Sequence, residues 1–240
     1  MNYRWNWSIF WAQAPDGSGT YMHTLIMGVS AVAWIIALAV GVLVGVLRTG
    51  RIKWLANICA GYVEVFRNIP LLVQLFLWYF VFPEVVPKAL GDFIKTADPT
   101  LSTYWTAVVC LGLFTSTRVA EQIRAGINSL PVGQSMAATA LGLRRPQVYR
   151  YVLLPETLRI IMPPLTSEAL NLIKNTSVAF TIGLIEITGA ARSMQEFSFQ
   201  IFESFAAATV LYLIINTVVV ILMRYIEKWM SVPGFISTEK

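Results

Sequence analysis

A long stretch without a charged residue, residues 25–47, constrains this chain more than any other feature. At ~1.5 Å of rise per residue, a helix of that length crosses the roughly 30 Å of hydrocarbon in a bilayer. The composition agrees, because 56% of the 240 residues are hydrophobic and only 13% are charged. A chain this apolar is not an ordinary soluble domain. We therefore expect a membrane protein whose first transmembrane helix covers residues 25–47.

Further apolar segments extend this pattern, at about residues 66–82, 103–123, 165–187 and 206–224. A proline removes a backbone donor and restricts the residue before it. Pro70 therefore predicts an irregular start to the second span, and Pro163-Pro164 predicts a break before the fourth. The charged segments 83–99 and 186–203 are expected to be loops. The predicted fold is all-α, with five transmembrane helices in a single domain over residues 1–240.

Two basic clusters predict the orientation of these helices. One follows the first span and the other follows the third: Arg48, Arg51 and Lys53, and then Arg124, Arg144, Arg145, Arg150 and Arg159. Short loops rich in arginine and lysine stay in the cytoplasm. Both clusters are therefore predicted to be cytoplasmic. Five crossings then place the N-terminus outside the membrane and the C-terminus inside.

Several classes of function lack their sequence signatures here. The net charge is +5, but the basic residues form no solvated stripe with interleaved aromatic residues, so nucleic acid is not an expected partner. Cys59 and Cys110 have no second ligand at metal spacing, and we interpret them as small buried hydrophobes. The sequence has no Gly-rich phosphate loop and no Ser/His/Asp set. We expect no catalysis and no bound cofactor, so uphill transport would need energy from a partner.

The segment from about residue 131 to residue 155 combines helix formers with turn residues. Residues 134–141 are rich in Ala, Met and Leu, and Gly142 suits a left-handed helix end. Pro146 suits the first turn of a new helix. We therefore predict two short helices that meet at Gly142. The small residues Ala137 and Ala138 are expected to leave a shallow face that another protein can approach closely.

This segment resembles the cytoplasmic coupling loop of ABC-importer permeases, named for its Glu-Ala-Ala start, through Gly133-Gln134, Ala137-Ala138, Ala140-Leu141-Gly142 and Leu154-Pro155. Residues 66–74, 121–127 and 174–177 are similar to motifs of the polar amino-acid branch of that family. The chain's opening and the region of Arg118 look most like the permease subunits of glutamate/aspartate importers. Met136 departs from the pattern, because the family has glutamate at that position.

The resemblance implies a non-catalytic permease in the bacterial cytoplasmic (inner) membrane. Its implied partners are a second, related permease in a heterodimer, two ATP-binding subunits that hold the ATP, an external substrate-binding protein and membrane lipid. The implied contact with the ATPase consists of Gly133, Gln134, Met136, Ala137, Ala138, Leu141 and Gly142.

Polar and charged residues within the predicted spans are candidates for a substrate path, because ions are costly in a bilayer. They are Arg118, Glu121, Glu168, Asn171, Lys174, Asn175 and Ser177. Most of the family has an aromatic residue where this chain has Arg118. A guanidinium is a planar, permanent cation that matches a carboxylate. We hypothesise that Arg118, together with Lys174, stabilises an acidic amino acid, glutamate or aspartate, as it crosses.

Other interpretations of the same residues stay open. In one, the charged side chains form an internal ion-pair network and the polar side chains hydrogen-bond one helix to another. In another interpretation, the transported solute is glutamine, histidine or a basic amino acid. A channel or secondary carrier that works without ATP is a further alternative.

Overall fold

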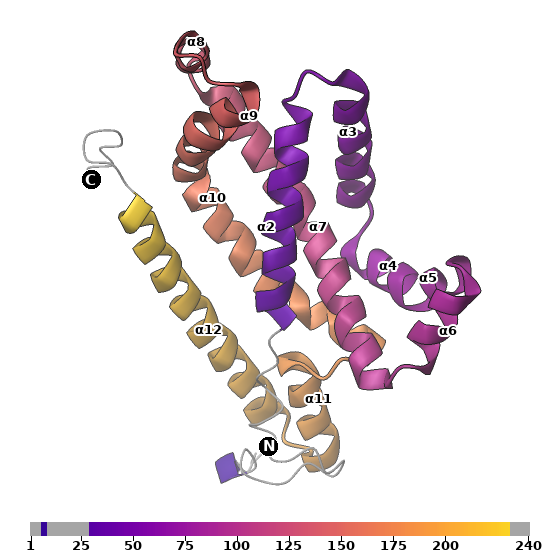
Figure 1. Cartoon of the computed structure of the whole chain (residues 1–240). Helices are drawn as coiled ribbons and strands as arrows, with labels where there is room; N and C mark the ends of the chain where they lie inside the picture. The colour runs from indigo at the N-terminus through magenta and orange to yellow at the C-terminus, as the bar shows by residue number, and fades with distance from the viewer. Residues whose placement is uncertain (1–5, 9–28, 231–240) are drawn as a thin grey trace. The chain divides into compact units, whose positions relative to one another are not determined.

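The structure, a computed structural model, describes residues 6–8 and 29–230. Figure 1 shows that the regular elements of these residues are helices. In chain order they are α2 (Val29–Arg48), α3 (Lys53–Asn68), α4 (Leu71–Phe76), η2 (Leu77–Val81), α5 (Phe82–Val85), α6 (Lys88–Thr96), α7 (Pro99–Ser129), α8 (Val132–Ala140), α9 (Arg145–Val148), η3 (Tyr149–Leu153), α10 (Leu154–Asn175), η4 (Thr176–Ile182), α11 (Ile187–Ser198) and α12 (Ile201–Met230). Here η2 and η3 are π-helical turns, and η4 is a 3-10 helix.

The chain forms two compact units. Of the described residues, unit 1 comprises 6–8, 29–35, 69–112 and 171–217, and unit 2 comprises 36–68, 113–170 and 218–230. The boundary between the units falls within α2, α7, α10 and α12.

Close packing of α2 on α7 organises unit 2. A Cβ added at Gly41 would lie 2.6 Å from Val119 Cβ, and one at Gly45 would lie 2.7 Å from Ile123 Cβ. The two glycines are one helical turn apart and let the backbones approach closely, as small residues do between membrane helices. The start of the predicted first span, before Val29, lies outside the described residues.

Helix α3 is joined to α7 by a partly buried group of hydrogen bonds. The Tyr62 hydroxyl lies 2.7 Å from Ser116 Oγ and 3.1 Å from the Leu113 carbonyl oxygen, to which it donates. Beside it, Val44, Cys59, Val63 and Ala120 form an apolar cluster. Cys59 is therefore a small core residue, as its sequence context predicted.

Helix α10 runs without a break through Pro163 and Pro164, so the predicted break before the fourth span is wrong. A proline within a helix deprives the carbonyl four residues earlier of its donor, here those of Arg159 and Ile160, but prolines are tolerated within the helices of a membrane bundle. Helix α7 contacts α10 at this point, where Gln122 Nε2 donates to the Pro164 carbonyl oxygen at 3.3 Å. The irregular turns lie instead at the two ends of α10, in η3 and η4.

In unit 1, both segments that were predicted as loops contain helices. Residues 83–99 include α6, which begins after Pro87, where a proline costs no internal hydrogen bond. Residues 186–203 include α11, which begins at a side-chain cap in which Glu186 Oε1 accepts from the Gly189 N–H at 2.8 Å. The Tyr212 hydroxyl donates to the other oxygen of Glu186 at 2.8 Å and so joins α12 to this cap.

Within the described residues, α2 and α12 are long and apolar enough to cross a membrane. A third candidate is the pair Lys53–Asn68 and Leu71–Val85, which is bent by 104°. The bend falls at Pro70, where an irregular entry was predicted. Helices α7 and α10 match the spans predicted at 103–123 and 165–187 in position, but they are less apolar than α2 and α12. Much of α7 between Ala107 and Ile123 is buried, so it meets other helices rather than lipid.

Candidate functional site

The segment from α8 to the start of α10, which we call the coupling segment, begins with a helix that ends at a glycine turn. Gly142 has φ +84, in the left-handed region that suits glycine. Its N–H donates to the Thr139 carbonyl at 3.0 Å, and the Leu143 N–H donates to the Ala138 carbonyl at 3.2 Å. This pair of bonds is the Schellman arrangement, which satisfies the last carbonyls of a helix. The predicted turn at Gly142 is therefore confirmed.

The second helix of the coupling segment, α9, has Pro146 in its first turn, as predicted. The Arg144 N–H donates to Gln147 Oε1 at 2.8 Å, which satisfies a backbone donor at the start of the helix. After α9, the Tyr149 hydroxyl donates to the Thr49 carbonyl oxygen at 3.0 Å and lies 3.2 Å from Thr49 Oγ1. The coupling segment is thus joined to the turn between α2 and α3, 100 residues earlier.

Helix α8 and its turn present an apolar surface. Val132, Met136 and Leu141 are 68%, 66% and 84% exposed, and Ala137 is exposed beside them. Ala138 is only 5% exposed and belongs to the core of the subunit. Consecutive helical residues point about 100° apart, so two neighbouring alanines do not share one face. The prediction that Ala137 and Ala138 form a single accessible face is therefore wrong, and Ala137 alone is accessible.

Arg118 stands on α7 with an exposed guanidinium and a loose partner. Its Nη1 lies 3.6 Å from Glu168 Oε2, and the guanidinium carbon lies 5.1 Å from the centre of the Phe114 ring. The Arg118 side chain is 40% exposed and the Glu168 side chain 14%. A separation of 3.6 Å is too long for a hydrogen bond. Arg118 is therefore held by charge and by the ring, while its N–H donors remain available.

Glu121, one turn along α7, is engaged by two arginines. Its carboxylate contacts Arg48 at the end of α2, and Arg124 lies 3.0 Å away. Both partners come from basic clusters that the sequence placed in the cytoplasm. The ion-pair network that the sequence left open as an alternative therefore fits Glu121 better than a place in a substrate path.

The other predicted path residues belong to unit 1, at the end of α10 and the start of η4. They are Asn171, Lys174, Asn175 and Ser177. Lys174 is exposed, whereas Ser177 Oγ donates to the Lys174 carbonyl at 2.7 Å and so satisfies its own helix. The structure thus brings Arg118 and Glu168 together in unit 2, and it places the polar residues of α10 and η4 in unit 1.

Two features of the site had no signal in the sequence. Tyr149 is a polar aromatic residue among arginines, and its partner Thr49 lies too far away in the sequence for any periodicity to connect them. The end of α12 forms a hollow with the start of α10, lined by residues that include Arg150, Arg159 and Trp229. Only the basic character of the two arginines was visible in the sequence.

Residues 37–232 match the family described as the binding-protein-dependent transport system inner membrane component. The match covers most of the chain, and it agrees with the all-helical fold. The chain therefore belongs to this family, the membrane permeases of ABC importers.

Individual relatives narrow the comparison. The chain is 45% identical to the glutamate/aspartate import permease protein GltJ of Escherichia coli K12, over 98% of each chain. It is 34% identical to the octopine transport system permease protein OccM of Rhizobium radiobacter, over 85% of this chain and 81% of that protein. A crystal structure of an amino acid ABC transporter with histidines matches at a TM-score of 0.69 with 28% identity, covering 86% of this chain and 90% of that one.

Family membership confirms several predictions made from the sequence. The chain is a multi-pass component of the inner membrane and a non-catalytic subunit. ATP is handled by separate ATPase subunits, and a binding protein serves the same transport system.

Proposed function

We propose that this chain is the permease subunit through which an acidic amino acid, glutamate or aspartate, crosses the inner membrane. The full-length similarity to a glutamate/aspartate import permease supports this cargo. The observation that carries the proposal is the state of Arg118, a cation whose N–H donors are not hydrogen-bonded within the described part of the chain.

The contacts of Arg118 suit a transient carboxylate. Phe114 fixes the guanidinium from one side by a cation–π contact, and Glu168 balances its charge without taking its N–H groups. A substrate carboxylate would gain two parallel charge-assisted hydrogen bonds, which is the geometry that arginine offers and lysine does not. Lys174 and Asn171 on α10 are the next candidates for this path, and Glu121 serves the structure of the cytoplasmic side instead.

The coupling segment is the proposed contact with the ATPase subunit. Its exposed members Gly133, Met136, Ala137, Leu141 and Gly142, with the half-buried Gln134, would enter the partner's surface, and Ala138 would support them from beneath. Met136 replaces the glutamate of the family pattern with an apolar side chain on this surface. An apolar contact of this kind suits docking into a groove.

We also propose the arrangement of the subunit in the membrane. Five spans in one transmembrane domain, with the N-terminus outside and the C-terminus inside, are supported by the four long helices α2, α7, α10 and α12 and by the bent pair of α3 with α4 and α5. Both units belong to that domain in this proposal, because the four long helices are continuous across their boundary. A related second permease completes the pathway as a heterodimer.

Uptake by the complete importer in liposomes tests the cargo. Arg118→Gln should lower the rate of glutamate uptake at low substrate concentration by about tenfold to a hundredfold, because a hydrogen bond to a charged group contributes roughly 1.5–3 kcal/mol. Arg118→Lys keeps the positive charge but not the two parallel N–H donors, so its uptake rate should lie between those of the unaltered importer and Arg118→Gln. Arg51→Gln, at an exposed arginine outside the predicted path, is the matched control for loss of a positive charge.

Competition by a panel of amino acids separates the cargo assignment from its alternatives. Glutamate and aspartate should compete for uptake, whereas glutamine, histidine, arginine and octopine should not. Full glutamate uptake by Arg118→Gln, or stronger competition by histidine, would contradict the assignment. Concentrative uptake by this chain without ATPase subunits would contradict the proposal as a whole.

A further inference from the structure

We propose that an anionic phospholipid binds in the hollow between the segment 150–159 and the end of α12, with its phosphate at Arg150. We call this site the arginine hollow. It is separate from the coupling surface of α8 and from Arg118, and it concerns the lipid around the importer rather than the cargo.

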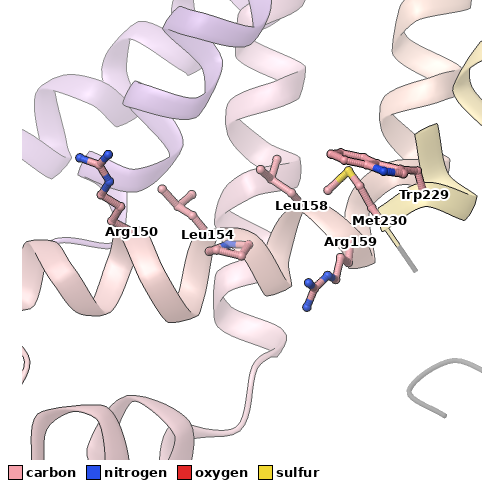
Figure 2. Close-up of a pocket in the computed structure, with 7 residues that line it drawn as sticks. Arg150, Leu154, Leu158, Arg159, Trp229 and Met230 are labelled. Atoms are coloured by element: carbon pink, nitrogen blue, oxygen red, sulfur yellow. The ribbon is translucent and has the colours of Figure 1, made fainter. Parts of the chain in front are cut away.

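The arginine hollow has a volume of about 460 Å³ and is formed by two segments of unit 2. Figure 2 shows Arg150, Leu154 and Leu158 following one another along one segment, with Trp229 and Met230 reaching from the end of α12 toward Leu158. The guanidinium groups of Arg150 and Arg159 lie at different ends of this row. The hollow therefore combines an apolar floor with two cations.

The cations have different partners. Arg159 Nη1 lies 3.0 Å from Glu156 Oε2, which holds its side chain in place and neutralises part of its charge. Arg150 stacks at 5.8 Å from the Tyr151 ring centre and forms no ion pair within the described residues. Arg150 is thus the stronger attractor for an anion, and Arg159 adds a partly neutralised positive charge at the other end of the hollow.

The end of α12 adds the features of a membrane–water boundary. Arg224, Glu227 and Lys228 stand in its last two turns, after the apolar stretch that qualifies α12 as a span. Trp229, which lines the hollow, is 82% exposed and Tyr225 is 74% exposed. Tryptophan and tyrosine gather at the level of the lipid headgroups. Basic pockets between membrane helices at this level bind anionic headgroups.

The apolar floor favours a lipid over a free phosphate. A phosphate ion would contact one arginine and gain nothing from Leu154, Leu158 or Met230. A phospholipid places its phosphate at Arg150 and its acyl chains along these side chains, so both kinds of lining are used. Each arginine near an anionic lipid surface contributes about 1 kcal/mol to the free energy of binding, which corresponds to roughly a fivefold preference for the charged headgroup.

Photolabelling of the complete importer tests this site. The importer is placed in phosphatidylcholine nanodiscs that contain a trace of photoactivatable phosphatidylglycerol or, separately, photoactivatable phosphatidylcholine. Mass spectrometry then measures the adducts on the peptides around Arg150 and Trp229. We expect phosphatidylglycerol to label these peptides at least fivefold more than phosphatidylcholine, and inorganic phosphate in excess to leave the label unchanged.

Paired variants separate charge from shape. Arg150→Gln with Arg159→Gln should lower the phosphatidylglycerol preference about fivefold or more, whereas Arg150→Lys with Arg159→Lys should keep it. Arg51→Gln, at an exposed arginine that does not line the hollow, should also keep it.

Four results would overturn the proposal. They are equal labelling by both headgroups in the unaltered importer, unchanged labelling in the double glutamine variant, competition by inorganic phosphate, and no label in the complete importer because another subunit covers the hollow. The headgroup comparison needs no variant, so a double variant that fails to fold does not remove the test. None of these results measures uptake, so they leave the cargo assignment as it stands.

Discussion

At the scale of single residues, small side chains in the coupling segment have distinct tasks. Gly142 provides a backbone conformation, Ala138 fills a place in the core, and Ala137 leaves an accessible surface. The sequence shows three small residues close together and does not reveal that their roles differ. Each task is tested by a different substitution.

Substitution of the two alanines should separate docking from folding. Ala137→Leu should leave the permease stable but reduce the amount of ATPase subunit that co-purifies with it, because a bulky side chain would stand on the exposed surface. Ala138→Leu should lower the thermal stability of the permease itself, since overpacking a core costs about 1–3 kcal/mol. The two properties are measured on the same detergent-solubilised complexes. Loss of docking in Ala138→Leu with full stability would contradict this division.

Gly142→Ala should weaken the end of α8 through backbone strain alone. No atom lies within 4 Å of an added Cβ, so space is not the obstacle. The left-handed conformation costs a residue with a Cβ about 1–2 kcal/mol, and asparagine tolerates it better than alanine. We expect Gly142→Ala, more than Gly142→Asn, to lower transport per ATP hydrolysed. Gly133→Ala, which also has open space around it but lies within the helix, is the control for stability of the segment.

At the scale of helices, patterns of neighbouring residues predicted the helices and turns that depend on those residues alone. The charge-free run predicted α2, and the glycine and proline predicted the turn between α8 and α9. The predicted break at Pro163-Pro164 was wrong, since α10 continues through both prolines, and Gln122 of α7, 42 residues earlier, contacts α10 there at the Pro164 carbonyl. The pairing of Arg48 with Glu121 likewise joins residues 73 apart. Composition and periodicity do not contain such contacts.

The packing of α2 on α7 gives a prediction at this scale. Gly41→Ala would place a Cβ 2.6 Å from Val119 Cβ and 2.9 Å from the Ser116 carbonyl oxygen, so the helices would have to separate. We expect a loss of about 1–3 kcal/mol in stability, measured as a lower midpoint of thermal aggregation. Gly61→Ala on α3 meets nothing within 4 Å and should be neutral or stabilising, because alanine favours helices. Equal midpoints for the two variants would refute the packing argument.

At the scale of the whole molecule, topology follows from which loops a reagent can reach. Cysteine placed at Ser135 in the coupling segment should react with a membrane-impermeant maleimide only in inverted membrane vesicles. Cysteine placed at Asp98, before α7, should react only in intact cells from which the outer membrane is stripped. The native Cys59 and Cys110 are buried, which keeps the background low. Labelling of both sites from one side would contradict an odd number of crossings between them.

The hydrogen bond between Tyr149 and Thr49 gives the coupling segment a second connection to the rest of the subunit, beside its covalent connection to α10. A movement of α8 is transmitted to α10 through the backbone and to the α2–α3 turn through the Tyr149 hydroxyl group. Tyr149→Phe would keep the aromatic ring and remove this hydrogen bond, so movement of α8 should be transmitted less completely to the α2–α3 turn. ATP hydrolysis would then continue while fewer solute molecules cross per turnover, by a few-fold rather than completely. A single hydroxyl oxygen thus keeps the movement of the coupling segment linked to the α2–α3 turn.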